Sequence, residues 1–292
     1  MSTPRAVDAP LVSPAATSGL LEVFRRRYLL RLLVRREVSA RYQGSFFGLV
    51  WSYINPLSQL FIYWFVMGKI VGLGDRTENF AIHVFSALIA VHFFTETFQA
   101  GTRSIVRNKA LVRKMAIPRE MFPVASMLVS GFHAIPQIIV LLVVCVASGW
   151  TPDPVGVAAG VLGLLIVMVW GTSLALLFSA ANVFFRDFGQ AVNILTNFVR
   201  FSVPMIYPFT LVEERFGDYA FLYLWNPLAD AVLLMQRCFW VGTTDDKQAT
   251  IALNIPDNLY TMSAIALLGG LVMLLIAQMV FTRLENKMPE RL

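Results

Sequence analysis

Three ionisable side chains inside apolar segments are the residues of this sequence best placed to do chemistry. His92 and Glu96 lie four residues apart in one apolar segment, which places them on the same face of a helix. Arg200 lies near the middle of a later apolar segment. Polar groups at membrane depth are costly and mark functional sites, so we expect Glu96 and Arg200 either to pair across a helical bundle or to line a wet passage. The alternative is that both side chains snorkel toward lipid headgroups.

The sequence contains no recognisable catalytic or metal-binding pattern. Gly68-Lys69 lacks the glycine spacing that precedes a P-loop lysine and the Ser or Thr that follows it. His92 and Glu96 alone are too few ligands for a metal site, and the cysteines have no metal-ligand spacing. We therefore expect a protein that is not an enzyme and that binds no cofactor itself.

The composition is typical of a membrane protein. Hydrophobic residues make up 57% of the chain and charged residues only 14%, and the mean hydropathy is +0.65. About a quarter of the residues in a soluble domain are charged, so the sequence predicts an all-α polytopic membrane protein. The net charge of +6 is explained by Lys and Arg that retain loops in the cytoplasm, and we expect no nucleic acid partner.

Six apolar segments are long enough to cross a bilayer, since a spanning helix needs about 20 residues. Together they predict a transmembrane domain over residues 45–283, followed by a short cytoplasmic tail at 284–292. The six predicted transmembrane helices cover residues 46–71, 80–100, 122–148, 155–185, 188–207 and 259–281.

The first ordered element precedes these spans. Residues 20–44 carry apolar side chains at helical spacing with arginines between them, which predicts an amphipathic helix in the headgroup plane. A solvated arginine-rich linker is the alternative. Residues 1–19 are rich in Pro, Ala and Ser, so we expect a disordered cytoplasmic tail and no signal peptide. The apolar stripe of the helix consists of Leu21, Phe24, Tyr28 and Leu32.

The distribution of Lys and Arg predicts the orientation. They gather in the N-terminal stretch, in the loop over residues 103–121 and in the C-terminal tail, which a six-span count places on one side. The loops on the opposite side carry mostly acids. The positive-inside rule therefore predicts that both termini are cytoplasmic in a bacterial plasma membrane.

Residues 210–258 join the fifth and sixth spans on the outer side and are too apolar for a simple loop. An aromatic cluster at 219–225 precedes Asn226-Pro227 and an apolar stretch at 228–240, and neither half is long enough to span. This pattern predicts two short outer re-entrant helices, which are tolerated where protein or water satisfies their backbone. A pair of interfacial helices with an aromatic belt is the alternative.

Four groups of short motifs occur in order along these segments, from about residue 20 to the end of the chain. They are Arg41-Tyr42-x-x-Ser45-x-Phe47-Gly48-x-x-Trp51 with Asn55-Pro56; Asn108 to Pro123, with Leu111-Val112-Arg113-Lys114 and Ile117-Pro118-Arg119-Glu120; Asn182-Val183-Phe184-Phe185-Arg186-Asp187; and Pro204-Met205-Ile206-Tyr207-Pro208 with Asn226-Pro227-Leu228 and Arg237. In this order they resemble the permeases of the type 2 ABC exporter family, in the branch that exports O-antigen, capsule, teichoic acid and cell-wall galactan. Phe47 stands where that family usually has leucine.

The resemblance implies partners and residue roles. It implies a homodimer of this permease with two copies of an ABC ATPase subunit, which carries the ATP and Mg²⁺. The N-terminal helix would be a gate at the membrane surface that attracts an anionic headgroup, the 103–121 loop would couple to the ATPase, and the re-entrant helices would close the exit. The residues concerned are Arg27, Arg31, Arg35, Arg36, Arg41 and Tyr42 for the gate helix; Arg107, Asn108, Arg113, Lys114, Pro118 and Arg119 for coupling; Arg186 and Asp187 for the cytoplasmic signature; and Tyr223, Trp225, Asn226, Pro227 and Arg237 for the outer gate.

The expected function is export of a polyprenyl-diphosphate-linked polysaccharide, with this chain as the permease subunit in contact with membrane lipid. One alternative is an ABC permease for drugs or lipids, against which the Arg-Tyr-x-x-Ser entry and the aromatic outer segment argue. A membrane sugar-phosphate transferase is another, but it needs clustered acids for a metal diphosphate, and the acids on the cytoplasmic side are scattered. A scaffold subunit would leave the gate-like elements without a role.

Overall fold

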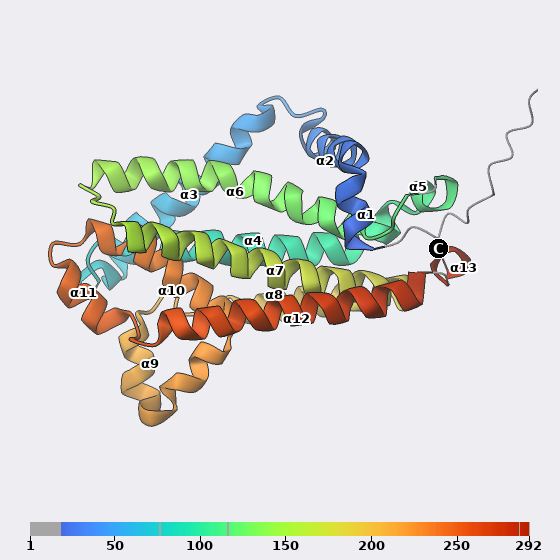
Figure 1. Cartoon of the computed structure of the whole chain (residues 1–292). Helices are drawn as coiled ribbons and strands as arrows, with labels where there is room; N and C mark the ends of the chain where they lie inside the picture. Colours follow the sequence, from blue (N-terminus) through green and yellow to red (C-terminus); the bar gives the residue numbers. More distant parts are fainter. Residues whose placement is uncertain (1–18, 76, 116, 286, 292) are drawn as a thin grey trace, which may run out of the picture.

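The computed structural model describes residues 19–75, 77–115, 117–285 and 287–291, and every regular element in this part of the chain is helical. The tail predicted to be disordered lies, apart from Gly19, outside the described residues. Four helices are long and apolar enough to cross a membrane, and they match the second, third, fourth and sixth predicted spans. They lie along one another in Figure 1 and are α4 (Phe80–Arg107), α6 (Met121–Ala147), α7 (Pro154–Phe184) and α12 (Leu259–Glu285).

Helix α7 packs against α4, α12 and the shorter α10 (Pro227–Phe239). Glycines on α7 allow α10 to approach closely. A Cβ atom at Gly160 would lie 2.7 Å from Sγ of Cys238, and one at Gly163 would lie 3.0 Å from the carbonyl oxygen of Ala231. Small residues serve helix packing in membranes in this way, because they let two backbones come together.

The first predicted span is present as two consecutive helical pieces. Helix α3 (Trp51–Phe61) has 11 residues, and the π-helix η3 (Ile62–Ile70) continues it for 9 more. Pro56 lies inside α3 and has no N–H to donate to the preceding turn, which weakens the helix there. Neither piece is among the described helices that could cross a membrane alone.

The fifth predicted span differs from the structure. Helix α8 covers only Phe188–Val199, and its 12 residues extend about 18 Å, short of the bilayer core of about 30 Å. Residues 200–208 contain turns and no helix, because Pro204 and Pro208 interrupt the segment. The prediction of one continuous helix over 188–207 is therefore wrong.

Side chains from α10 and its cap satisfy the backbone of this interrupted segment. Nε2 of Gln236 donates to the carbonyl oxygen of Pro204 at 2.8 Å, and Nδ2 of Asn226 donates to that of Ser202 at 3.1 Å. Every residue from Leu228 to Phe239 of α10 is buried. Non-helical backbone at membrane depth needs such partners, so α10 and the interrupted segment stabilise each other.

The segment between α8 and α12 contains one buried helix and several smaller pieces. Helix α10 starts where the Asn226-Pro227 motif predicts, with Oδ1 of Asn226 accepting a hydrogen bond from the backbone N of Leu228 at 3.1 Å. The aromatic half before it is a 3-10 helix rather than an α-helix, and α9 projects away from the long helices (Figure 1). The smaller pieces are α9 (Phe209–Phe216), η5 (Gly217–Trp225), η6 (Val241–Thr243) and α11 (Lys247–Asn254).

The predicted N-terminal helix is divided at Arg26 into α1 (Leu20–Arg25) and α2 (Arg27–Tyr42). Val23, Leu30 and Leu33 are its buried side chains. The predicted apolar stripe faces away from the bundle, and its exposed members are Leu21, Phe24, Tyr28 and Leu32.

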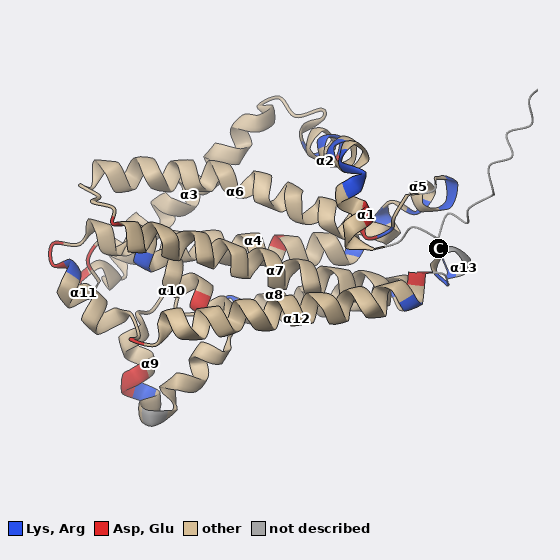
Figure 2. Ribbon diagram, viewed as in Figure 1, with Lys and Arg blue, Asp and Glu red and all other residues tan. Residues whose placement is uncertain are grey.

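The charges are divided between the two ends of the molecule (Figure 2). Lys and Arg gather where α1, α2, α5 (Lys109–Lys114), α13 (Met288–Arg291) and the end of α12 lie. Acidic side chains predominate toward the opposite end, near α11. This is the asymmetry from which the sequence predicts an inner and an outer side.

Candidate functional site

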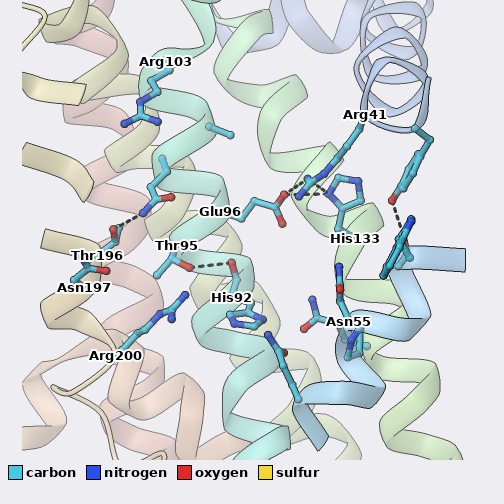
Figure 3. A pocket seen from close by; sticks show the side chains of 18 of the residues that line it. Arg41, Asn55, His92, Thr95, Glu96, Arg103, His133, Thr196, Asn197 and Arg200 are labelled. Atoms are coloured by element: carbon cyan, nitrogen blue, oxygen red, sulfur yellow. Dashed lines mark hydrogen bonds and ion pairs between the residues drawn. The ribbon is translucent and has the colours of Figure 1, made fainter. Parts of the chain in front are cut away.

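A polar cavity of about 890 Å³ lies between the C-terminal end of α2 and helices α3, α4, α6 and α8. It follows α4 from Arg107 to His92, so its mouth begins at the basic end of the bundle. Glu96 and Arg200 both line it, with Glu96 directed toward Arg41 and His133 and Arg200 toward Thr95 and His92 (Figure 3). The structure thus brings the three ionisable residues of the apolar segments together around one cavity.

An ion pair connects α2 with α4 inside this cavity. Nη1 of Arg41 pairs with Oε1 of Glu96 and lies 2.6 Å from Nδ1 of His133 on α6, while the same Nδ1 lies 3.0 Å from Oε1 of Glu96. Glu96 therefore takes Arg41 as its basic partner. Of the possibilities that the sequence left open for Glu96 and Arg200, the structure shows two side chains that line one cavity, and not a pair between them. The side chains of Arg41 and Glu96 are 54% and 27% exposed, so solvent reaches the pair.

The cavity carries an excess of positive charge. Among the described residues that line it are four guanidinium groups and one carboxylate, that of Glu96. Guanidinium groups bind phosphates and carboxylates through paired hydrogen bonds, so the cavity is chemically suited to an anionic group. The four arginines are Arg41, Arg103, Arg107 and Arg200.

The predicted gate-helix residues form two groups in the structure. Arg41 and Tyr42 lie at the end of α2 and line the cavity, where the hydroxyl of Tyr42 is hydrogen-bonded to Oγ of Ser52 on α3. The other arginines are exposed along α2, and one of them, Arg36, donates to Oδ1 of Asn108 at 3.4 Å. The exposed group is Arg27, Arg31, Arg35 and Arg36.

The start of the predicted coupling loop is tied to α2. Oε2 of Glu37 accepts a hydrogen bond from Nη2 of Arg107 at 2.6 Å, and its Oε1 accepts one from Nδ2 of Asn108 at 3.3 Å. Sequence analysis missed Glu37. The sequence could have indicated it, because Glu37 is the one acid in the arginine-rich α2, and a lone acid among arginines indicates a specific basic partner. A displacement at the end of α4 therefore reaches α2 through this contact.

The end of the same loop is tied to α12. Nη1 of Arg119 donates to the carbonyl oxygen of Glu285, and Oε1 of the buried Glu120 accepts from Nε2 of Gln278 at 2.8 Å. The predicted coupling residue Arg119 is thus a structural tie, and Glu120 beside it is an additional one that sequence analysis did not select.

Helix α5 lies between these two ties. Arg113 and Lys114 are exposed at its end, and Pro118 after it is buried. The structure therefore holds this exposed basic helix at both ends, to α2 through Arg107 and Asn108 and to α12 through Arg119.

The motif after the fourth span closes the turn between α7 and α8. Nδ2 of Asn182 donates to the carbonyl oxygen of Thr102 on α4 at 3.2 Å, and its Oδ1 accepts from the backbone N of Gly189 at 3.0 Å. Arg186 and Asp187, the predicted signature residues, are exposed. The residue that holds the turn is therefore the buried Asn182, and the charged pair beside it faces outward.

A bidentate ion pair anchors α10 at the opposite end of the molecule. Nη1 and Nη2 of Arg237 lie 2.8 and 2.7 Å from Oδ1 and Oδ2 of Asp153. Asp153 also caps α7, because its Oδ2 accepts from the backbone N of Gly156 at 3.1 Å. The hydrogen bonds from Arg237 hold the pKa of the Asp153 carboxyl below its ordinary value. Arg237, a predicted outer-gate residue, thus joins α10 to the start of α7.

The other predicted outer-gate residues lie around the start of α10. Asn226 caps this helix and Pro227 is its first residue. The hydroxyl of Tyr223 lies 2.6 Å from that of Tyr207 in the interrupted segment, whereas Trp225 is exposed. The structure therefore binds Tyr223 into the interior and leaves Trp225 on the surface.

Comparison with known proteins identifies the family. The sequence pattern of the family described as ABC-2 type transporter matches residues 28–240. An O-antigen export system permease protein RfbA of Klebsiella pneumoniae is 23% identical over 262 residues, which cover 90% of this chain and 94% of that protein. A protein of the same name from Myxococcus xanthus is 27% identical over 232 residues, which cover 80% of this chain and 88% of that protein. With its four membrane-length apolar helices, this multi-pass membrane protein belongs to the ABC-2 type transporter family.

Proposed function

We propose that this chain is the permease subunit of an ABC exporter that moves a lipid-linked polysaccharide outward across the bacterial plasma membrane. The observation that carries the proposal is the cavity of about 890 Å³ with its polar and guanidinium lining. Such walls suit a diphosphate headgroup and sugar hydroxyls, whereas a site for drugs is mostly apolar. The O-antigen export permeases among its relatives support the same class of cargo.

We infer six membrane crossings with both termini in the cytoplasm. In this arrangement α3 with η3 forms the first crossing, α8 with residues 200–208 forms the fifth, and η5 with α10 forms the re-entrant outer segment. The gathering of Lys and Arg at the end that holds α1, α2 and α13 supports the orientation (Figure 2), because such residues stay on the cytoplasmic side.

The proposed assembly contains two copies of this chain and two copies of an ABC ATPase subunit, which binds the ATP and Mg²⁺. The exposed basic face of α5 supports contact with the ATPase. The exposed apolar face of α8 supports contact between the two copies, and its residues are Ile194, Leu195 and Phe198.

In the proposed cycle, the exposed arginines of α2 attract the diphosphate of a polyprenyl carrier at the inner leaflet. ATP binding closes the ATPase dimer and pushes α5. Because Glu37 joins α2 to Arg107 and Asn108, the push reaches α2 and widens the cavity. The glycan then passes outward as the segment around η5 moves.

Depletion of the protein in its native host tests this function. Polyprenyl-linked glycans are extracted and sized, and the polysaccharide at the cell surface is measured. The proposal predicts that a long lipid-linked polymer accumulates inside while less reaches the surface. A normal glycan pool after full depletion would reject polysaccharide export and favour a drug or lipid cargo.

A further inference from the structure

Two of the cavity's arginines are already engaged by carboxylates. Arg107 pairs with Glu37 at 2.6 Å, and Arg41 pairs with Glu96. Arg103 and Arg200 line the same cavity with no carboxylate partner among the described residues. Figure 3 shows Arg41 and Arg103 on either side of Glu96, with Arg200 deeper in the cavity. Glu96 is therefore the one carboxylate among the described residues that line the cavity, beside four guanidinium groups.

His133 offers Glu96 a second partner. Its Nδ1 lies 2.6 Å from Nη1 of Arg41 and 3.0 Å from Oε1 of Glu96. One ring nitrogen cannot accept a hydrogen bond from Arg41 and donate one to Glu96 at the same time. The two contacts therefore belong to different tautomers of His133, and Glu96 gains a hydrogen-bond donor when Arg41 leaves and the ring proton moves from Nε2 to Nδ1. This lowers the cost of breaking the Arg41–Glu96 pair, since the partly buried Glu96 carboxylate is not left without a donor.

We propose that Arg41, Arg103 and Arg200 form the binding site for the diphosphate headgroup of the lipid-linked substrate, and that Glu96 is an internal competitor for Arg41. When the headgroup enters, its oxygens replace the Glu96 carboxylate on Arg41, and His133 takes over Glu96. The inference rests on the proposed export function and adds the residues that recognise the cargo.

The exchange has a consequence for α2. In the structure the end of α2 is held to α4 by Arg41, while its middle is held by Glu37. A headgroup that captures Arg41 releases the first contact and leaves the second in place. The loaded state thereby loosens the end of α2 next to the cavity while α2 stays connected to the coupling loop.

Binding measurements on the full chain test the exchange. Farnesyl diphosphate is titrated against the purified protein in detergent by calorimetry. Arg41→Gln should weaken binding about tenfold, and Glu96→Gln should tighten it about fivefold, because it frees Arg41 from a half-exposed ion pair. The matched control is Glu22→Gln, which removes an acid of α1 that pairs with Arg26 outside the cavity and should leave affinity unchanged. Unchanged or weaker binding by Glu96→Gln would overturn the proposal.

His133→Gln separates exchange from simple support of the fold. It should weaken binding about threefold in the otherwise native chain and have no effect in the Glu96→Gln background. Equal weakening in both backgrounds would show that His133 only maintains structure. Each variant is first compared with the native protein by size-exclusion chromatography and thermal unfolding. Glu96→Asp, which keeps the negative charge, is the control for Glu96→Gln and should not tighten binding.

Inorganic pyrophosphate distinguishes the source of the anion. Weaker binding of inorganic pyrophosphate than of farnesyl diphosphate assigns the site to a lipid headgroup, and equal or tighter binding overturns that assignment. Failure of the headgroup-exchange proposal is distinguishable from failure of the proposed export function, because the depletion experiment measures the glycan pool and does not depend on Glu96.

Discussion

The two ends of this permease hold their helices together in different ways. At the basic end, which we propose is the inner one, α2 is attached through ion pairs whose arginines are about half exposed, 54% for Arg41 and 52% for Arg107. At the opposite end, which we propose is the outer one, α10 is buried along its length, and its ion pair joins an arginine side chain that is 9% exposed to the Asp153 carboxylate, which is 39% exposed. Exposed pairs contribute little to stability, whereas removing one partner of a pair with a buried member costs more. Together with the burial of α10, this predicts that α2 moves more readily than α10.

This contrast limits which elements could move in the proposed outer gate. Helix α10 is fixed to α7 by Asp153 and Arg237, and the close approach at Gly160 leaves no room for sliding. The segment before it, α9 and η5, is largely exposed. If the exit opens, α9 and η5 are the elements that move, and α10 is the wall against which they close.

The largest effect on stability is expected from removal of the outer anchor. Arg237→Met leaves the Asp153 carboxylate without its bidentate partner and should lower the free energy of unfolding by about 2–3 kcal/mol, less than for a fully buried pair because Asp153 is 39% exposed. Arg41→Met at the inner end is the matched comparison and should cost at most about 1 kcal/mol. Both are measured by thermal unfolding of the detergent-solubilised protein. Equal losses for the two variants would remove the distinction between the ends.

A smaller loss is expected at the contact between α7 and α10. Gly160→Ala places a Cβ atom 2.7 Å from Sγ of Cys238, and overpacking of this kind costs about 1–3 kcal/mol. Gly269→Ala on α12 is the control, because its Cβ would meet only Trp170 at an ordinary 3.7 Å. The control should be neutral in the same unfolding assay, and a neutral Gly160→Ala would mean that α10 is free to shift.

Much of this fold could be predicted from the sequence, because a membrane-spanning helix is recognisable from its length and apolar composition. The spans around α4, α6, α7 and α12 fall within a few residues of their predicted positions at most boundaries. The start of α10 follows from Asn226-Pro227, since a capping side chain and a first-turn proline act locally.

The errors arise where apolar composition is compatible with more than one backbone. Residues 200–208 are as apolar as a helix would be, yet Pro204 and Pro208 interrupt them, and Gln236 from a distant segment satisfies the exposed carbonyl. The sequence around residues 200–208 contains no information about Gln236 as the hydrogen-bond donor.

The candidate site shows the same limit. His92, Glu96 and Arg200 stand out in the sequence because they are polar among apolar neighbours. Arg41, the partner of Glu96, does not stand out in the sequence, because it lies 55 residues earlier and is one of many arginines in its helix. Only the packing of α2 against α6 selects it.

At the inner end, a change too small to unfold the protein is expected to reduce transport. Glu37→Gln weakens the contacts with Arg107 and Asn108 and should lower the free energy of unfolding by less than about 1 kcal/mol. Export should fall severalfold because α5 no longer drives α2, while ATP hydrolysis by the assembled transporter continues. The readout is surface glycan per ATP hydrolysed. Glu22→Gln serves as the control, and an unchanged ratio in Glu37→Gln would reject the route through α2.

The smallest effect is a pH dependence at the outer anchor. The pKa of Asp153 in the folded protein is held below its ordinary value of 3.8 by Arg237, so near pH 4 the unfolded chain binds more protons than the folded one. The stabilisation is therefore fully present above about pH 5 and is lost as the pH falls through the folded-state pKa. The unfolding temperature of the native protein should exceed that of Asp153→Asn by a constant margin from about pH 7 to pH 5, and the margin should shrink below about pH 4. Arg237→Met, which keeps the carboxyl but removes its partner, should lose the same acid-sensitive component. A margin that is as large at about pH 3 as at neutral pH would mean that the ion pair does not anchor α10.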